Sequence, residues 1–200
     1  IPSTAACTRP VMRVVVGKPG METPLLAGFI RYAVLNPYWN IPPDLVRHTV
    51  APAVIREGPG VLAQRRYVLS ADWRSTARIE PAAVDWPAVA AGRSSVWVRQ
   101  LPGGRNMMGA VKFMLPNEMG IYLHDTPDKS LFQRADRHLS SGCVRLEDAA
   151  RLGRWLFGRE IVGSDAAPDR RVDLAEPVPV FVTRLATRLE NGRVRFRREG

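Results

Sequence analysis

Cys143 and His124 are the two side chains whose types and spacing best suit nucleophilic chemistry. Cys143 follows the small residues Ser141 and Gly142, and His124 lies 19 positions earlier, at the end of a short apolar segment. A thiol is mostly protonated near neutral pH, with an ordinary pKa of about 8.5, so it needs a base or a positive charge to become a nucleophile. An imidazole can accept its proton, and backbone N–H groups at small residues can stabilise an oxyanion. The pattern therefore favours thiol catalysis.

Each of the two residues has a simpler explanation when it is taken alone. A lone cysteine is usually an inert small hydrophobe in a core. A lone histidine near a strand end is more often a surface residue, or a core residue with its hydrogen bonds satisfied. The combination of strand-end His124, loop, small-residue turn and Cys143 shifts the balance toward a catalytic pair.

The elements that must position this pair are a strand before His124 and a helix after Cys143. Alternation over residues 121–124 predicts a strand with Tyr122 and His124 on one face. Helical spacing of apolar residues predicts a helix over 146–159. We expect this helix to follow the Cys143 turn directly, so that its N-terminus adds positive potential beside the thiol.

The sequence pattern of the rest of the chain indicates a mostly β fold with one clearly predicted helix and some shorter ones. Apolar runs and turn residues indicate the following further elements: strands at 11–16, 111–115, 178–183 and 193–196, the last two around an Asn191-Gly192 turn, a short helix at 85–91, and a strand or short helix at 25–36. Residues 36–43 predict a stiff loop, and residues 44–98 are less regular.

The composition indicates a globular domain with a basic surface. Two hundred residues, 46% hydrophobic and 24% charged, are enough for one sizeable core. No apolar run reaches the ~20 residues of a membrane span, and no signal-peptide pattern opens the chain. The net charge of +10 favours anionic partners such as acidic wall polymers. The chain has this positive charge but no RNA-binding or zinc-finger signature, so we expect no specific nucleic-acid partner.

Cys7 and Cys143 are the two cysteines of the chain. Two cysteines can form one disulfide, but the sequence does not show that their Cα atoms come within bridging distance. Cys7 lies in an irregular stretch near the terminus, whereas Cys143 lies in a dense polar motif. We therefore interpret Cys7 as incidental.

The segment 121–145 resembles the signature of the L,D-transpeptidase catalytic (YkuD-type) domain. In that family a His precedes a Ser/Thr-His-Gly-Cys motif by about fifteen residues, and here His124 precedes Ser140-Ser141-Gly142-Cys143-Val144-Arg145. Ser141 stands where many members have a second His, and Arg145 where many have Asn. Both departures match the large periplasmic branch of the family.

Further blocks in the same order extend the resemblance over most of residues 11–183. They are Val14-Val15-Val16-Gly17-Lys18-Pro19 with Thr23-Pro24, Asn36-Pro37-Tyr38-Trp39-Asn40-Ile41-Pro42-Pro43, Gln100-Leu101-Pro102-Gly103 with Asn106 and Gly109, Val111-Lys112-Phe113-Met114, and His124-Asp125-Thr126-Pro127. The resemblance implies a β-sandwich or barrel-like catalytic domain spanning residues 1–200, shortened at its N-terminus, with an inserted capping lid of helices and loops at residues 44–98. It implies no metal and no other cofactor.

The catalytic roles that the resemblance implies belong to residues of the motif. Cys143 is expected to be the nucleophile and His124 its general base, oriented by the backbone carbonyl of Asp125. The oxyanion hole is expected at the backbone N–H groups of Gly142 and Cys143, with Ser141 as a further candidate.

Substrate contacts are expected at Tyr122, Trp39 and Arg145. A structural role for the two aromatic residues stays open. His138 and His48 match no motif and are expected at the surface.

The activity that the resemblance implies is peptidoglycan cross-linking by two-step acyl transfer, in the periplasm or cell envelope. Stem peptides would be both donor and acceptor, and carbapenem-type β-lactams would be covalent inhibitors. Three alternatives stay open: an L,D-carboxypeptidase, a wall-protein attachment enzyme with the same site, or an inactive wall-binding module.

Overall fold

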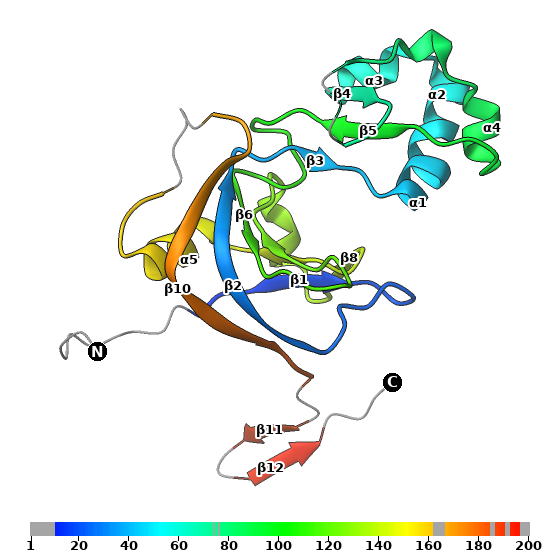
Figure 1. Ribbon diagram of the computed structural model, residues 1–200. Coiled ribbons are helices and arrows are strands. Elements are labelled where there is room, and N and C mark those ends of the chain that lie inside the picture. The colour runs from blue at the N-terminus through cyan, green and yellow to red at the C-terminus, as the bar shows by residue number, and fades with distance from the viewer. Residues whose placement is uncertain are drawn as a thin grey trace.

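The computed structural model describes residues 11–73, 75, 77–161, 167–184, 187–190 and 193–196. Two lobes stand out in Figure 1, one built on a large curved sheet and one built from short helices around a small sheet. The chain is therefore mostly β with few helices, as the sequence predicts.

The larger lobe is a seven-stranded mixed sheet in the order β10-β2-β6-β7-β9-β1-β8. Its strands are β1 (Val14–Gly17), β2 (Leu26–Leu35), β6 (Val111–Met114), β7 (Leu123–His124), β8 (His138–Ser140), β9 (Val144–Leu146) and β10 (Arg170–Val182). The pairs β7–β9 and β1–β8 are parallel, and the other neighbours are antiparallel. Parallel neighbours need a connecting crossover, so residues far apart in the sequence meet at the centre of the sheet.

One face of this sheet is apolar and packs against helix α5 (Ala149–Phe157). Phe113 and Val111 are fully buried on β6, and Val144 and Leu146 bring the same face onto β9. Figure 1 shows α5 lying against the ribbon formed by β2 and β10. Because one face is committed to this core, the residues that alternate with it must point to the opposite face.

The second lobe has a core of its own. It contains β3 (Trp39–Asn40), α1 (Pro43–Leu45), the π-helical turn η1 (Val46–Val50), α2 (Ala51–Glu57), α3 (Gly60–Gln64), β4 (Tyr67–Ser70), the 3-10 turn η2 (Pro81–Ala83), α4 (Trp86–Ala90) and β5 (Trp97–Gln100). β5 lies between β3 and β4. Buried aliphatic residues and Trp86 fill the space between the helices and this sheet.

Two buried amides hold the connection from this lobe to β6. Asn106 donates to the carbonyls of Gln100 and Leu101, at 3.2 and 3.0 Å. The Gln100 side chain donates to Arg65 O and Arg105 O. These bonds satisfy carbonyls at a partly buried turn, where unpaired groups shielded from water would be costly.

Several predicted elements are confirmed. The strands predicted at 11–16, 111–115 and 121–124 correspond to β1, β6 and β7, and the ambiguous segment 25–36 is the strand β2. The helix predicted at 85–91 is α4, and the Asp85 carboxylate caps it by accepting from Ala88 N at 2.9 Å.

Other predicted elements are wrong in their extent or pairing. The helix expected over 146–159 begins only at Ala149, because Leu146 pairs with Val14 in β9. Residues 44–98, expected to be less regular apart from the helix at 85–91, hold further short helices, and the loop expected at 36–43 includes β3.

The strand expected at 178–183 is the end of β10 and pairs with β2, not with 193–196. Instead β12 (Arg193–Phe196) pairs with β11 (Thr187–Glu190). The Asn191-Gly192 turn and Cys7 lie outside the described residues.

Within the described ranges, no helix combines the length and apolar character needed to cross a membrane. Strands β11 and β12, near the C-terminal end of the described residues, form a third sheet.

Gly17 of β1 occupies a position where the neighbouring backbone leaves no room for a side chain. A Cβ at Gly17 would lie 2.1 Å from Met21 O and 2.5 Å from Thr23 N. We expect Gly17→Ala to lower the free energy of unfolding by about 2 kcal/mol, measured by urea denaturation, because the loop after β1 must move.

Gly28→Ala is the matched control, since a Cβ at this β2 position meets only side-chain atoms of Leu115 and Leu26, the nearest at 3.5 Å. Its free energy of unfolding should stay close to that of the unchanged protein. Equal urea midpoints for the two variants would contradict the steric argument.

Candidate active site

The parallel pairing of β7 with β9 places the predicted site residues on neighbouring strands. Leu123 pairs with Val144, and His124 pairs with Arg145. Val144 N donates to Tyr122 O at 3.2 Å, so Cys143, just before β9, lies beside Tyr122. Because Val144 joins the apolar core, alternation sends Arg145 to the opposite face, together with His124.

His124 is a buried imidazole held by a backbone carbonyl. Its side chain is 2% exposed, and its Nδ1 lies 2.5 Å from Asp125 O. Burial lowers the pKa of His124 to about 4, and the positive charges of Arg145 and Lys112 act in the same direction. The ring is therefore neutral near pH 7, and with Nδ1 donating to the carbonyl its Nε2 is free of a proton.

The Asp125 carboxylate faces away from the imidazole and joins other elements. Its Oδ1 accepts from Lys129 Nζ at 2.6 Å, and its Oδ2 accepts from Ala110 N at 2.9 Å. The carboxylate thereby fixes the position of the peptide whose carbonyl contacts His124.

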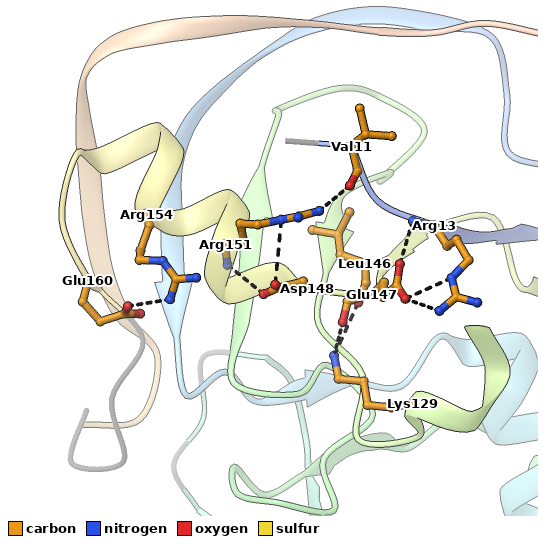
Figure 2. A network of polar contacts seen from close by, with 9 residues as sticks. All are labelled: Val11, Arg13, Lys129, Leu146, Glu147, Asp148, Arg151, Arg154 and Glu160. Carbon is orange, nitrogen blue, oxygen red and sulfur yellow. Dashed lines mark hydrogen bonds and ion pairs between the residues drawn. The ribbon is translucent and has the colours of Figure 1, made fainter. Parts of the chain in front are cut away.

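Lys129, which is paired with Asp125 after β7, also binds the end of β9, and Figure 2 shows its contacts with Leu146 and Glu147. Its Nζ donates to Glu147 O at 3.0 Å and reaches Leu146 O at 3.5 Å. The Glu147 carboxylate binds the backbone and guanidinium of Arg13, and these bonds lower its pKa to about 2. Strand ends on both sides of the site are therefore anchored by polar contacts.

Cys143 is a half-buried free thiol. Its Sγ lies 3.8 Å from Gly120 O. Burial raises the pKa of Cys143, while hydrogen bonds to the backbone and phenol of Tyr122 and the charge of Arg145 act in the opposite direction. Tyr122 also lies against the imidazole, and the centroids of the Tyr122 and His124 rings are 5.8 Å apart. The resting site thus holds a protonated thiol and a neutral base.

The turn that carries Cys143 is held by two hydroxyl groups. Ser140 Oγ donates to Cys143 O at 2.6 Å and accepts from Gly142 N at 3.2 Å. Thr23 Oγ1 donates to Gly142 O at 2.7 Å and accepts from Gly17 N at 2.9 Å. Gly142 has φ +114°, a conformation that favours glycine.

The sequence interpretation missed the part that Thr23 plays. Its contact with Gly142 joins positions 119 residues apart. The one available signal was the Thr23-Pro24 pair in the block after β1, which carries no local indication of a distant partner.

The prediction that a helix N-terminus lies beside Cys143 is wrong. The residue opens onto β9, and α5 begins only at Ala149 with Asp148 as its cap. A helix macrodipole acts mainly within its first turn, so it is not the source of positive potential at the thiol. Arg145 is the positive charge that lowers the pKa of Cys143.

The remaining predicted residues lie in different surroundings. Trp39 lies in β3 and packs against the core of the second lobe. Ser141 is exposed, and so are His48 and His138. His138 pairs with Asp136 at 2.6 Å. Among the residues that the structure describes, no group of three or more His, Cys, Asp and Glu side chains could hold a metal ion.

This geometry defines a mostly β domain with a buried histidine on one strand of its sheet and a cysteine in the turn just before the neighbouring strand. The chain belongs to the L,D-transpeptidase catalytic domain (YkuD) family, whose profile matches residues 8–180.

A Haemophilus influenzae protein named "Putative L,D-transpeptidase" is 30% identical over 189 residues. That alignment covers 91% of this chain but only 38% of the relative, so the chain spans about two fifths of the length of that protein.

The raised pKa of Cys143 predicts how the free thiol reacts. In a Cys7→Ser background, the rate of alkylation by iodoacetamide should rise about tenfold per pH unit across neutral pH, because only the thiolate reacts. Tyr122→Phe should slow alkylation at a fixed pH, since it removes a hydrogen bond that lowers the thiol pKa. Mass spectrometry of the labelled protein measures both rates.

A rate that reaches a plateau near pH 6 would contradict this prediction, because it would indicate a thiolate–imidazolium pair in the resting enzyme. The Cys143→Ala variant in the same background gives the rate of nonspecific labelling.

Proposed function

We propose that the protein is a peptidoglycan L,D-transpeptidase that forms 3-3 cross-links through a cysteine thioester. The observation that carries the proposal is the pairing of β7 with β9, which puts the anchored imidazole of His124 and the thiol turn of Cys143 on adjacent strands. Membership of the L,D-transpeptidase family supports the same chemistry.

The first half of the proposed reaction acylates Cys143. His124 Nε2 accepts the thiol proton as Sγ bonds to the carbonyl carbon of the third stem residue. The C=O electron pair moves to oxygen, and its return breaks the C–N bond to the terminal D-alanine. The leaving nitrogen takes the proton from His124, so the imidazole is again neutral.

The second half transfers the acyl group to an amine. The side-chain amine of another stem attacks the thioester, His124 accepts a proton from this amine, and the thiol takes the proton back as it leaves. The product is an amide between two third residues. No step requires a metal or another cofactor.

The electrostatics of the resting site support proton transfer together with attack. The pKa of Cys143 is raised and that of His124 is about 4, so a preformed thiolate–imidazolium pair is a minor state of the free enzyme. Proton transfer that accompanies attack avoids this pair. The Asp125 carbonyl holds the ring with Nε2 available throughout.

The oxyanion hole is proposed at the backbone N–H groups around Cys143. The Gly142 amide already donates to Ser140 Oγ in the turn, so it would have to share its proton with an oxyanion. The amides of Ser141 and Cys143 are the other candidates. Substrate contacts are proposed for Tyr122, beside the thiol, and for Arg145.

The second lobe and Trp39 are proposed to cap the substrate. Support comes from the insertion of this lobe between β2 and β6, the strand that neighbours β7. Cell-envelope localisation and stem-peptide partners are proposed on family membership, since the chain spans only part of its relative.

Hydrolysis of the thioester by water would make the same site an L,D-carboxypeptidase, and a protein amine would make it an attachment enzyme. A purified disaccharide-tetrapeptide separates the first two activities. We expect mass spectrometry to find a dimer with a 3-3 bond. Disaccharide-tripeptide as the only product would reject cross-linking in favour of hydrolysis.

Cys143→Ala tests the nucleophile directly. We expect the unchanged protein to form a covalent adduct with a carbapenem and the variant to form none, because the acylated sulfur is absent. Intact-protein mass spectrometry measures the adduct. The Cys7→Ser variant, which should still be acylated, is the control.

An undiminished adduct on Cys143→Ala would sink the nucleophile assignment. Absence of any adduct or turnover in the unchanged protein would instead favour a wall-binding module without activity.

A further inference from the structure

Lys112, His124 and Arg145 form a row across three neighbouring strands. Lys112 of β6 pairs with His124 of β7, and His124 pairs with Arg145 of β9. Directly paired residues on adjacent strands share one face of a sheet, with Cβ atoms about 5 Å apart. The neutral base therefore lies between two cationic side chains.

The carboxylates that interact electrostatically with these two cations accept hydrogen bonds from other residues. Asp169, which interacts with Lys112, accepts from Tyr38 N at 3.0 Å. Asp128, which interacts with Arg145, accepts from the backbone and hydroxyl of Ser130 at the start of the 3-10 turn η3 (Lys129–Gln133).

Both cations lack a protein partner in the part of the chain that is described. Arg145 Nε is buried there without a hydrogen-bond partner. Within the same residues, no hydrogen bond or ion pair joins Lys112 to another side chain. Asp125, the carboxylate adjacent to His124, is already paired with Lys129.

This arrangement is costly without a ligand. Burial lowers the pKa of both Lys112 and Arg145, which means that each charge is held in surroundings that disfavour it. Half-buried charges are normally paired, and a guanidinium matches a carboxylate in shape. An anion beside His124 would give both cations a partner that accepts direct hydrogen bonds.

We propose that Lys112 and Arg145 form a subsite that binds a carboxylate of the donor peptide beside His124. The inference rests on the proposed function, and it names the substrate group that the row recognises. Two sources share this chemistry: the terminal carboxylate of the leaving D-amino acid, and a carboxylate on the diamino acid that is acylated.

Binding of this carboxylate also strengthens the base. Both cations lower the pKa of His124, so an anion placed between them offsets their field and raises that pKa. The imidazole becomes a better proton acceptor only when a donor is in place. The subsite thereby couples donor recognition to activation of Cys143 and limits reaction of the free enzyme.

An NMR titration of the imidazoles tests this coupling. In the Cys143→Ala background, which prevents turnover, we expect saturating disaccharide-tetrapeptide to raise the pKa of His124 from about 4. Lys112→Met should raise it without any donor, because a neighbouring positive charge is removed. His48 and His138, both exposed, are internal controls. An unchanged His124 pKa in both experiments would overturn the proposal.

Steady-state kinetics with three donors identify the carboxylate. We expect Lys112→Met and Arg145→Met each to raise KM for the tetrapeptide donor roughly tenfold. Lys112→Arg should restore KM. This penalty should vanish for a donor amidated at the C-terminus if the terminal carboxylate binds there, and for a donor amidated on the diamino acid if that carboxylate does. Arg31→Met, an exposed change on β2, is the matched control.

Equal penalties on all three donors would overturn the subsite while leaving the transpeptidase assignment intact. A different result would reject the transpeptidase assignment itself: the unchanged protein would show no turnover that depends on Cys143.

Discussion

The parallel pairing of β7 with β9 is the constraint on which the rest of the site depends. It sets Tyr122 beside the Cys143 turn and His124 beside Arg145, so the order of the motif in the sequence becomes an order in space. Lys129 joins the ends of both strands, and Thr23 and Ser140 hold the turn before β9. Movement of one strand relative to the other would therefore separate base, thiol and charge together.

Burial has opposite consequences for the two central groups of this site. It lowers the pKa of His124 and raises that of Cys143, and both shifts favour the uncharged forms. In the proposed mechanism, the bound substrate supplies the charge that this uncharged pair needs for reaction. The proposed donor carboxylate would place a negative charge between Lys112 and Arg145. The nearby carboxylates of the protein do not occupy this position, since they are hydrogen-bonded to other groups.

Much of the site followed from the sequence because its residues are local to one motif. Alternation placed Tyr122 and His124 on one face, and the ring contact between them agrees. The helix after Cys143 was predicted too early, because Leu146 has helical spacing but pairs with Val14. Local pattern cannot distinguish these outcomes when the competing partner lies more than a hundred residues away, and for the same reason Thr23 was not recognised as a support of the turn.

The sequence by itself determined the family and the mostly β class, and it singled out the proposed thiol and imidazole, because these depend on residue types at short spacings. Only the tertiary structure decided that Lys112 lies beside His124 and that the positive potential at Cys143 comes from Arg145 rather than from a helix. It also decided which carboxylates are already hydrogen-bonded. The physical reason is that strand register and burial are set by contacts between distant segments, and these contacts determine the charge that each group carries.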